Sequence, residues 1–286
     1  MKNTEIGERG AEPYRLQRIL VAVDLGVCMD RAADRALMLA AQGAAVHFVH
    51  VAEPSAPADG VAIGRLWEAM TRLTTEIIEN TPAGRIVVTG EVLQGAIDDT
   101  VVRAAGTMGA EIVVVGSPRD MTLMGMIRGT VIDNIIRRAN CPILVVKARA
   151  RRPYAKIVAA VDLEGSSRKA LTFALKAFPD AAIEVVHIDE GGDAADEAAL
   201  RRRLEQLTAE CVADTGRAAA YGHGLRSIRV AQGRAAGILL EELPRMSPDL
   251  VVLGTHGRIG IDSLVFGSVA ETLTALLAQD TIVVRA

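Results

Sequence analysis

The sequence predicts an α/β fold in which two doubly wound, open parallel sheets of five strands each follow one another along the chain. Its 286 residues are more than one hydrophobic core of ordinary size needs, which indicates two domains. Half of the residues are hydrophobic but only 3% are aromatic, so Ala, Val, Leu and Ile must form the cores. Short β-branched runs alternate with amphipathic helical stretches, which is typical of parallel sheets covered by helices.

An internal repeat supports the prediction of two domains. Residues 19–25 read ILVAVDL and residues 157–163 read IVAAVDL, which gives an offset of 138 residues. The same offset relates four further pairs: Gly95 and Gly233, Gly116 and Gly254, Gly129 and Gly267, and Thr130 and Ser268. His50 and His187 correspond after a gap of one residue. We infer that one ancestral unit has been duplicated.

Each unit is expected to contain five strands. In the first unit they lie near residues 19–24, 45–51, 85–92, 111–116 and 142–147, and in the second near 156–162, 182–188, 226–231, 249–254 and 281–285. Two helical stretches carry apolar stripes that we assign to the core: Leu66, Met70, Leu73 and Ile77, and Leu200, Leu204, Leu207 and Cys211. The predicted domains are residues 1–147 and 156–286. The linker at 148–155 contains Pro153 and a solvated arginine cluster.

Charge and cysteine content limit the classes of partner. The formal net charge of −3 and pI near 6.0 provide no basic field for nucleic acid or an anionic membrane. No stretch is long and apolar enough to span a bilayer, so we expect a cytoplasmic protein. Cys28, Cys141 and Cys211 have neither disulfide-framework nor zinc-site spacing, and free thiols are expected.

A glycine-rich segment follows the fourth strand of the second unit. Ligands of open parallel sheets bind beyond the carboxyl ends of the strands, where the strand order reverses. Here Gly254 and Gly257 are followed, after nine residues, by Gly267 and Ser268. Ser268 is expected to open a helix with Val269, Leu273 and Leu276 on its apolar side. Bare backbone next to a helix N-terminus is suited to binding phosphate groups.

An aspartate ends the first strand of each unit, as Asp24 and Asp162. Each carboxylate is placed to accept a hydrogen bond from a ribose hydroxyl or an adenine amine, or to meet a cation. The alternative is a capping or turn residue that ends the strand and starts the helix. The recurrence of Asp before both glycine segments favours the binding role.

The strand ending in Asp, the segment VVLGTHGRIG and the G-x2-G-x9-G-S spacing resemble the universal stress protein family, from about residue 15 to the end. The resemblance implies a Rossmann-like fold and an ATP site in the second unit. In that site Asp162 contacts the nucleoside and backbone at Ile188 contacts adenine, whereas four residues wrap the phosphates: Gly254, Gly257, Gly267 and Ser268. The matching positions of the first unit are Asp24, Val51, Gly116, Gly129 and Thr130. Arg119 replaces the second glycine there, so we expect an altered site.

The leading hypothesis is therefore a regulatory stress-response protein that binds ATP or another adenine nucleotide, with or without Mg²⁺. No catalytic residue set and no protein metal site are identified, and His256 is assigned to the loop without a catalytic role. Two alternatives stay open, a slow Mg²⁺-dependent ATP hydrolase and a nucleotide-free scaffold for protein interactions. Family members pair their closing strands, so we expect residues 143–146 and 282–285 to join the units as a pseudo-twofold dimer, with further homodimerisation.

Overall fold

The computed structural model describes residues 16–25, 29–53, 60–117, 123–163, 165–191, 197–216, 225–255 and 268–285. Unit one contains the strands β1 (Leu16–Ala22), β2 (Ala40–Ala52), β3 (Ile86–Gln94), β4 (Ile112–Gly116) and β5 (Ile143–Val146). Its helices are α1 (Met29–Leu39), α2 (Gly60–Asn80), α3 (Ile97–Met108) and α4 (Leu123–Arg138). Unit two contains β6 (Lys156–Ala160), β7 (Ala182–Asp189), β8 (Leu225–Gln232), β9 (Leu250–Thr255) and β10 (Asp280–Arg285). Its helices are α5 (Gly165–Ala177), α6 (Glu197–Ala213), α7 (Ala235–Met246) and α8 (Ser268–Leu276).

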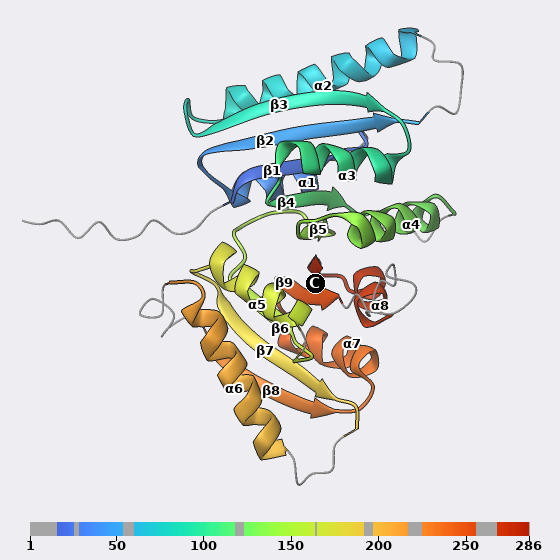
Figure 1. Ribbon diagram of the computed structural model, residues 1–286. Coiled ribbons are helices and arrows are strands. Elements are labelled where there is room, and N and C mark those ends of the chain that lie inside the picture. The colour runs from blue at the N-terminus through green and yellow to red at the C-terminus, as the bar shows by residue number, and fades with distance from the viewer. Residues whose placement is uncertain are drawn as a thin grey trace, which may run out of the picture.

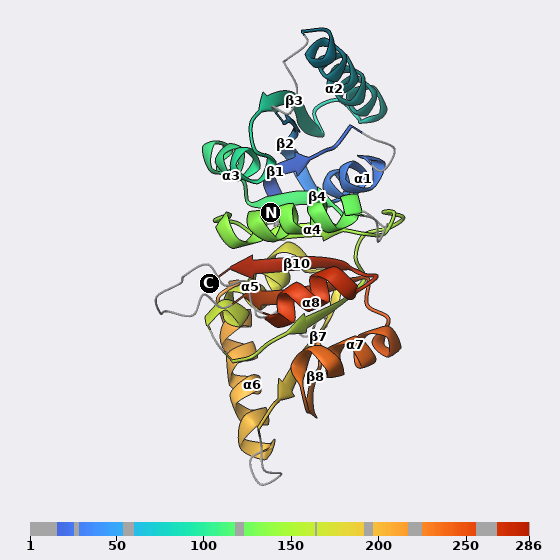
Figure 2. The ribbon, with the colours of Figure 1, turned by 90° about the vertical axis from the view of Figure 1, so that its right-hand side faces the viewer.

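The ten strands form one sheet in the order β3-β2-β1-β4-β5-β10-β9-β6-β7-β8. All neighbours within a unit are parallel, whereas β5 and β10 pair antiparallel through residues 143–145 and 281–283. Figures 1 and 2 show the two units one above the other, meeting where these strands pair. The prediction of an α/β fold with five parallel strands per unit is confirmed. The expected pairing of the closing strands is also found, and it joins both sheets into one.

Helices cover both faces of the sheet. Buried side chains of α1, α2, α5 and α6 form one core cluster, and those of α3, α4, α7 and α8 form the other. Both clusters run through both units. The central strands are buried on both faces, so they appear in the sequence as continuous apolar runs. The predicted stripes lie in the first cluster, with the following members buried or packed against it: Leu66, Met70, Leu73, Ile77, Leu200, Leu204, Leu207 and Cys211.

The start of β2 differs from the prediction. This strand begins at Ala40, directly after α1, instead of near residue 45. Leu16 pairs with Ala40 but Arg18 pairs with Ala45, so extra residues bulge out of β2. Gly43 lies in this bulge with φ of +76°, a backbone conformation that side chains disfavour.

The apolar side of α8 was also predicted imperfectly. Leu273 is buried as expected, but Leu276 is 62% exposed. Leu277, one residue beyond the end of the helix, occupies the buried position instead. The core stripe therefore follows the spacing of Ala270, Leu273 and Leu277, whereas Leu276 lies about 100° around the helix from it.

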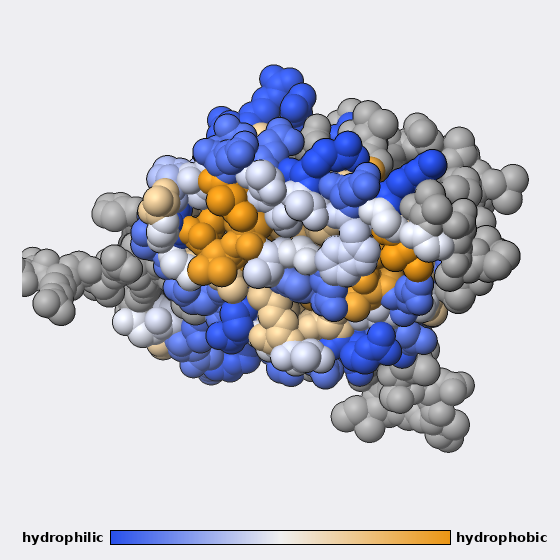
Figure 3. All heavy atoms as spheres, turned by 90° about the horizontal axis from the view of Figure 1, so that it is seen from above, coloured by the Kyte–Doolittle hydropathy of each residue, from blue (hydrophilic) through white to orange (hydrophobic). Residues whose placement is uncertain are grey.

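The edge of unit one carries exposed apolar side chains. Trp67 and Ile78 of α2 are 43% and 54% exposed, and Val87 of the edge strand β3 is 57% exposed. Figure 3, which shows the molecule from above, displays apolar side chains gathered in patches on this face. The homodimer expected from the sequence stays a prediction.

No described helix is both long and apolar enough to cross a membrane.

The segment between β5 and β6, residues 147–155, is called the connector here. Asp280, the first residue of β10, is fully buried and holds the connector in place. Its Oδ1 accepts backbone N–H groups of Lys147 at 2.8 Å and Ala148 at 2.9 Å, and its Oδ2 accepts the Tyr154 hydroxyl at 2.6 Å. Arg35 of α1 has its Nε 3.4 Å from Oδ2 and its guanidinium 3.9 Å from the centre of the Tyr154 ring. The connector thus fills one side of the junction between the units.

Two cations at corresponding positions cross the junction in opposite directions. Lys147 Nζ, after β5, donates to the backbone oxygens of Thr274 and Leu277 at the end of α8. Arg285 Nη1, at the end of β10, donates to the backbone oxygen of Arg137 in α4 at 2.6 Å. These three bonds satisfy backbone carbonyls at or just beyond a helix C-terminus, which the helix itself leaves unpaired. The reciprocal contacts show that the junction has pseudo-twofold symmetry.

Asp133 of α4 is expected to destabilise the fold when it is ionised. Burial, and then the negative charge of Glu271 on α8, raise the pKa of the Asp133 carboxyl from 3.8 to about 6. The folded state therefore binds this proton more tightly than the unfolded state, and stability falls as the pH rises through this window. Since Asp133 is half-buried and partly screened by solvent, Asp133→Asn should raise the free energy of unfolding near neutral pH by on the order of 1 kcal/mol.

Urea denaturation of wild type and Asp133→Asn over a range of pH measures this gain. It should shrink as the pH falls through about 6 and approach zero only below about 3, where the wild-type carboxyl is protonated in both the folded and the unfolded state. A variant that is less stable than wild type at neutral pH would contradict the prediction.

Candidate functional site

The predicted site residues of unit two lie at the carboxyl ends of three neighbouring strands. Asp162 follows β6, Ile188 belongs to β7 and Gly254 belongs to β9. The sheet order places β6 between β9 and β7, so the strand order reverses at β6. Asp24, Val51 and Gly116 occupy the matching ends of β1, β2 and β4 in unit one. The structure therefore brings these residues together at one edge of each unit.

The turn after the first strand has the same unusual backbone in both units. Leu25, after Asp24, has φ of +54°, and Leu163, after Asp162, has φ of +65°. A left-handed conformation is rare for a leucine, and such strain persists mainly where function requires it. In unit two the Ser167 hydroxyl donates to Asp162 Oδ1 at 2.5 Å and accepts the Asp162 N–H at 3.0 Å. Asp162 is thus a turn residue as well, yet it remains exposed, as does Asp24.

A histidine supports this turn in each unit. His50 Nδ1 lies 2.9 Å from the backbone oxygen of Val23, and His187 Nδ1 lies 2.7 Å from that of Val161. Each ring links the end of the second strand to the residue before the aspartate. The sequence contained a signal for this role, because both histidines recur in the repeat, but it did not indicate their partner.

The backbone at Ile188 faces the space beyond the end of β6. The last hydrogen bond between the end of β6 and β7 runs from the N–H of Val161 to the backbone oxygen of Val186 at 2.9 Å. Backbone groups point to alternate sides along a strand, so Ile188 faces the same side as Val186, beyond the end of β6. Unit one repeats this arrangement, because the N–H of Val23 donates to Val49 at 2.9 Å and Val51 lies two residues on. Within the described part of the chain, no strand pairs with this side of Ile188 or Val51.

The glycine that ends the fourth strand of unit two is closely packed. A Cβ built on Gly254 would lie 2.6 Å from Ser167 N and 2.7 Å from Ser166 C, in the first turn of α5. A Cβ on Gly116 would meet no described atom within 4 Å. Ser166 is 1% exposed, and its hydroxyl has no hydrogen-bond partner within the described part of the chain. The floor of the unit-two site is therefore closely packed and contains an unsatisfied buried hydroxyl, which a water or a ligand would be expected to satisfy.

The remaining predicted positions belong to the phosphate segment. Gly257, Gly267, His256 and Arg119 lie outside the described residues. Ser268 is exposed and opens α8 as predicted, and Gly129 and Thr130 lie within α4. Among the described residues, no group of three or more His, Cys, Asp or Glu side chains is arranged to hold a metal ion.

The model of the universal stress protein family matches residues 15–147 and again residues 153–285. The chain belongs to the universal stress protein family. Its two matches make it a tandem member with two universal stress protein domains, in agreement with the duplicated strand order and site residues.

Similar proteins support this membership. Universal stress proteins of Mycobacterium tuberculosis and Mycobacterium bovis are 28% identical over 193 residues, a match that covers 62% of this chain and 62% of theirs. The solved structure of a universal stress protein from Archaeoglobus fulgidus covers 96% of this chain and 97% of its own, with 15% identity and a TM-score of 0.72. One from Pseudomonas aeruginosa covers 94% and 93%, with 19% identity and a TM-score of 0.67. At these identities the structural matches show a shared fold.

Proposed function

We propose that unit two of this universal stress protein binds ATP and that the chain is a regulatory stress-response protein. In this role, nucleotide occupancy biases its conformation or its binding of a protein partner. The observation that carries the proposal is the arrangement at the strand ends of unit two. An exposed carboxylate, a backbone edge that no described strand pairs with, and a closely packed glycine lie at neighbouring strand ends, where the strand order reverses.

Each of these groups suits one part of the nucleotide. The Asp162 carboxylate is suited to accept hydrogen bonds from the ribose hydroxyls, and the backbone at Ile188 is suited to pair with the edge of adenine. The phosphates would then extend past Gly254 towards Ser268, where the N-terminus of α8 favours negative charge. Mg²⁺ would accompany the phosphates and be held mainly by their oxygens.

The matching aspartates of the two units provide the test. Asp162→Asn keeps an oxygen that can accept the Ser167 hydroxyl, so the turn should stay intact while the negative charge is lost. We expect ATP affinity, measured by titration calorimetry, to fall about tenfold, since a hydrogen bond to a charged group contributes roughly 1.5–3 kcal/mol. Asp24→Asn, the control in unit one, should bind ATP as wild type does.

Other outcomes would favour other functions. Equal losses in the two variants would contradict the assignment of ATP to unit two. A wild-type protein that does not bind ATP and releases no nucleotide on denaturation would instead be a scaffold for protein interactions. Steady phosphate release that Asp162→Asn abolishes, with ATP binding retained, would identify a slow hydrolase.

A further inference from the structure

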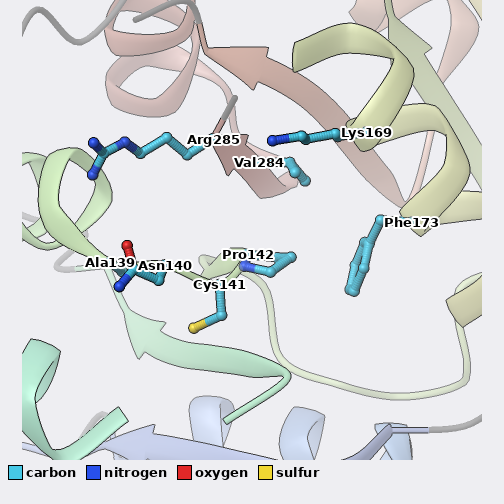
Figure 4. A pocket seen from close by; sticks show the side chains of 8 residues that line it. All are labelled: Ala139, Asn140, Cys141, Pro142, Lys169, Phe173, Val284 and Arg285. Carbon is cyan, nitrogen blue, oxygen red and sulfur yellow. The ribbon is translucent and has the colours of Figure 1, made fainter. Parts of the chain in front are cut away.

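A pocket of about 360 Å³ lies at the junction of the two units. Its wall comes from three places, namely the residues that lead into β5, the end of β10 and one side of α5. The lining residues are Ala139, Asn140, Cys141, Pro142, Lys169, Phe173, Val284 and Arg285 (Figure 4). None of these residues has been assigned to the nucleotide site, and the pocket is independent of the function proposed above.

The pseudo-twofold symmetry relates this pocket to the side of the junction that the connector fills. At the offset of 138 residues, the pocket residues Lys169, Phe173, Arg285 and Pro142 correspond to Arg31, Arg35, Lys147 and Asp280. These four counterparts all contact the connector or belong to it. The chain passes between the units once, so one side is filled by the connector and the other is left as the pocket.

The occupied side shows which chemistry this kind of recess accepts. It holds the aromatic ring of Tyr154, packed edge-on against Phe178 with ring centres 5.6 Å apart. It also holds the carboxylate of Asp280, which pairs with the guanidinium of Arg35. An aromatic ring and a carboxylate therefore lie together beside a cation. In this recess the ring and the anion come from the chain itself.

The pocket lining contains cations and an aromatic ring but no carboxylate. Lys169 and Arg285 are the charged residues of its lining, and none of the eight lining residues is acidic. Lys169 has no ion-pair partner among the described residues, and Figure 4 shows its amine extending across the pocket towards the end of β10. Phe173, Pro142 and Val284 add apolar surface beside these cations. Cations beside an aromatic ring favour a flat ligand with a negative charge.

We propose that this pocket binds a small aromatic carboxylate. Its carboxylate pairs with the Lys169 amine, and its ring packs against Phe173 and Pro142. Arg285, whose Nη1 donates to the backbone oxygen of Arg137, adds positive charge from the end of β10. The site lies where β5 and β10 join the units, so an occupant contacts both of them.

The test uses 4-hydroxyphenylacetate as the probe and the full-length protein. Titration calorimetry should show saturable binding of the probe, and the neutral amide of the same compound should bind at least about tenfold more weakly. Lys169→Gln should weaken probe binding by about tenfold, because it removes a charge-assisted hydrogen bond. Arg285→Gln should weaken it less, because this guanidinium adds charge while its Nη1 donates to Arg137. Lys176→Gln is the matched control, since Lys176 lies on the same helix but does not line the pocket.

Three results would overturn the proposal. The first is no saturable binding of the probe by wild type. The second is binding that all three variants retain, or that ATP displaces, since the probe would then occupy another site. The third is binding that appears only after residues 1–15 are removed, because the chain itself would then cover the pocket. Thermal unfolding of each variant checks that a loss of binding is not a loss of fold.

Discussion

Asp280→Ala is expected to lower the free energy of unfolding by about 3–5 kcal/mol, the largest loss that we predict for a single substitution. Asp280 is fully buried and accepts hydrogen bonds from Lys147, Ala148 and Tyr154. Arg35, which is 5% exposed, forms its ion pair with the same carboxylate. Removal of Asp280 would therefore leave a buried cation and two backbone N–H groups without their acceptor.

The phenol of Tyr154 supports the same account. Burial, and then the negative charge of Asp280, raise the pKa of Tyr154 well above its usual range. The phenol therefore stays protonated, and its hydroxyl donates a hydrogen bond to the Asp280 carboxylate at 2.6 Å. One carboxylate thus joins α1, the connector and β10.

Asp249 provides a matched control for this prediction. It also accepts two backbone N–H groups near the end of the connector, from Ala155 at 3.0 Å and Lys156 at 2.9 Å. Its side chain is 25% exposed, so water can replace some of these bonds, and Asp249→Ala should cost only about 1 kcal/mol. Chemical denaturation measures both variants. Equal losses for Asp280→Ala and Asp249→Ala would contradict the proposed role of the buried carboxylate.

Gly254→Ala is expected to weaken ATP binding by more than tenfold, on the order of 2 kcal/mol, whereas Gly116→Ala should leave it unchanged. A methyl group on Gly254 would lie 2.6 Å from Ser167 N, which is far inside contact distance. The obstacle is backbone, so either the end of β9 or the first turn of α5 must move. Both border the proposed site, and α5 begins directly after the Asp162 turn.

The same displacement should also lower stability. Overpacking of a closely packed position costs typically 1–3 kcal/mol, so Gly254→Ala should show this loss in chemical denaturation. Titration calorimetry with ATP completes the comparison. If Gly254→Ala binds ATP as tightly as Gly116→Ala does, the close packing of Gly254 does not serve the nucleotide site.

Much of the fold could be predicted because its strands are locally encoded. In β4 and β9 four consecutive residues are buried, so an apolar run alone marks each strand. Because the sequence repeats, the strands predicted for one unit also predict the corresponding strands of the other. The bulge at the start of β2 and the exposure of Leu276 were missed, since both depend on how an element packs rather than on its periodicity.

The sequence predicted the strand-end residues of the candidate site, but not the contacts that hold the surrounding structure in place. Asp162, Ile188 and Gly254 were selected from strand ends and family resemblance, and the structure places them together, while their role in binding stays a prediction. The contact of Asp280 with Tyr154 joins residues 126 positions apart, which no local pattern reveals. The close approach of Gly254 to the first turn of α5 depends on how this helix packs against β9, which no local pattern reveals.

The number of ATP molecules bound per chain tests the central claim most directly. Native mass spectrometry of the full-length protein with ATP in excess counts them without any substitution. The account predicts one ATP per chain, bound by unit two. Two molecules bound with similar affinity would contradict the difference between the units, and none would contradict nucleotide binding altogether.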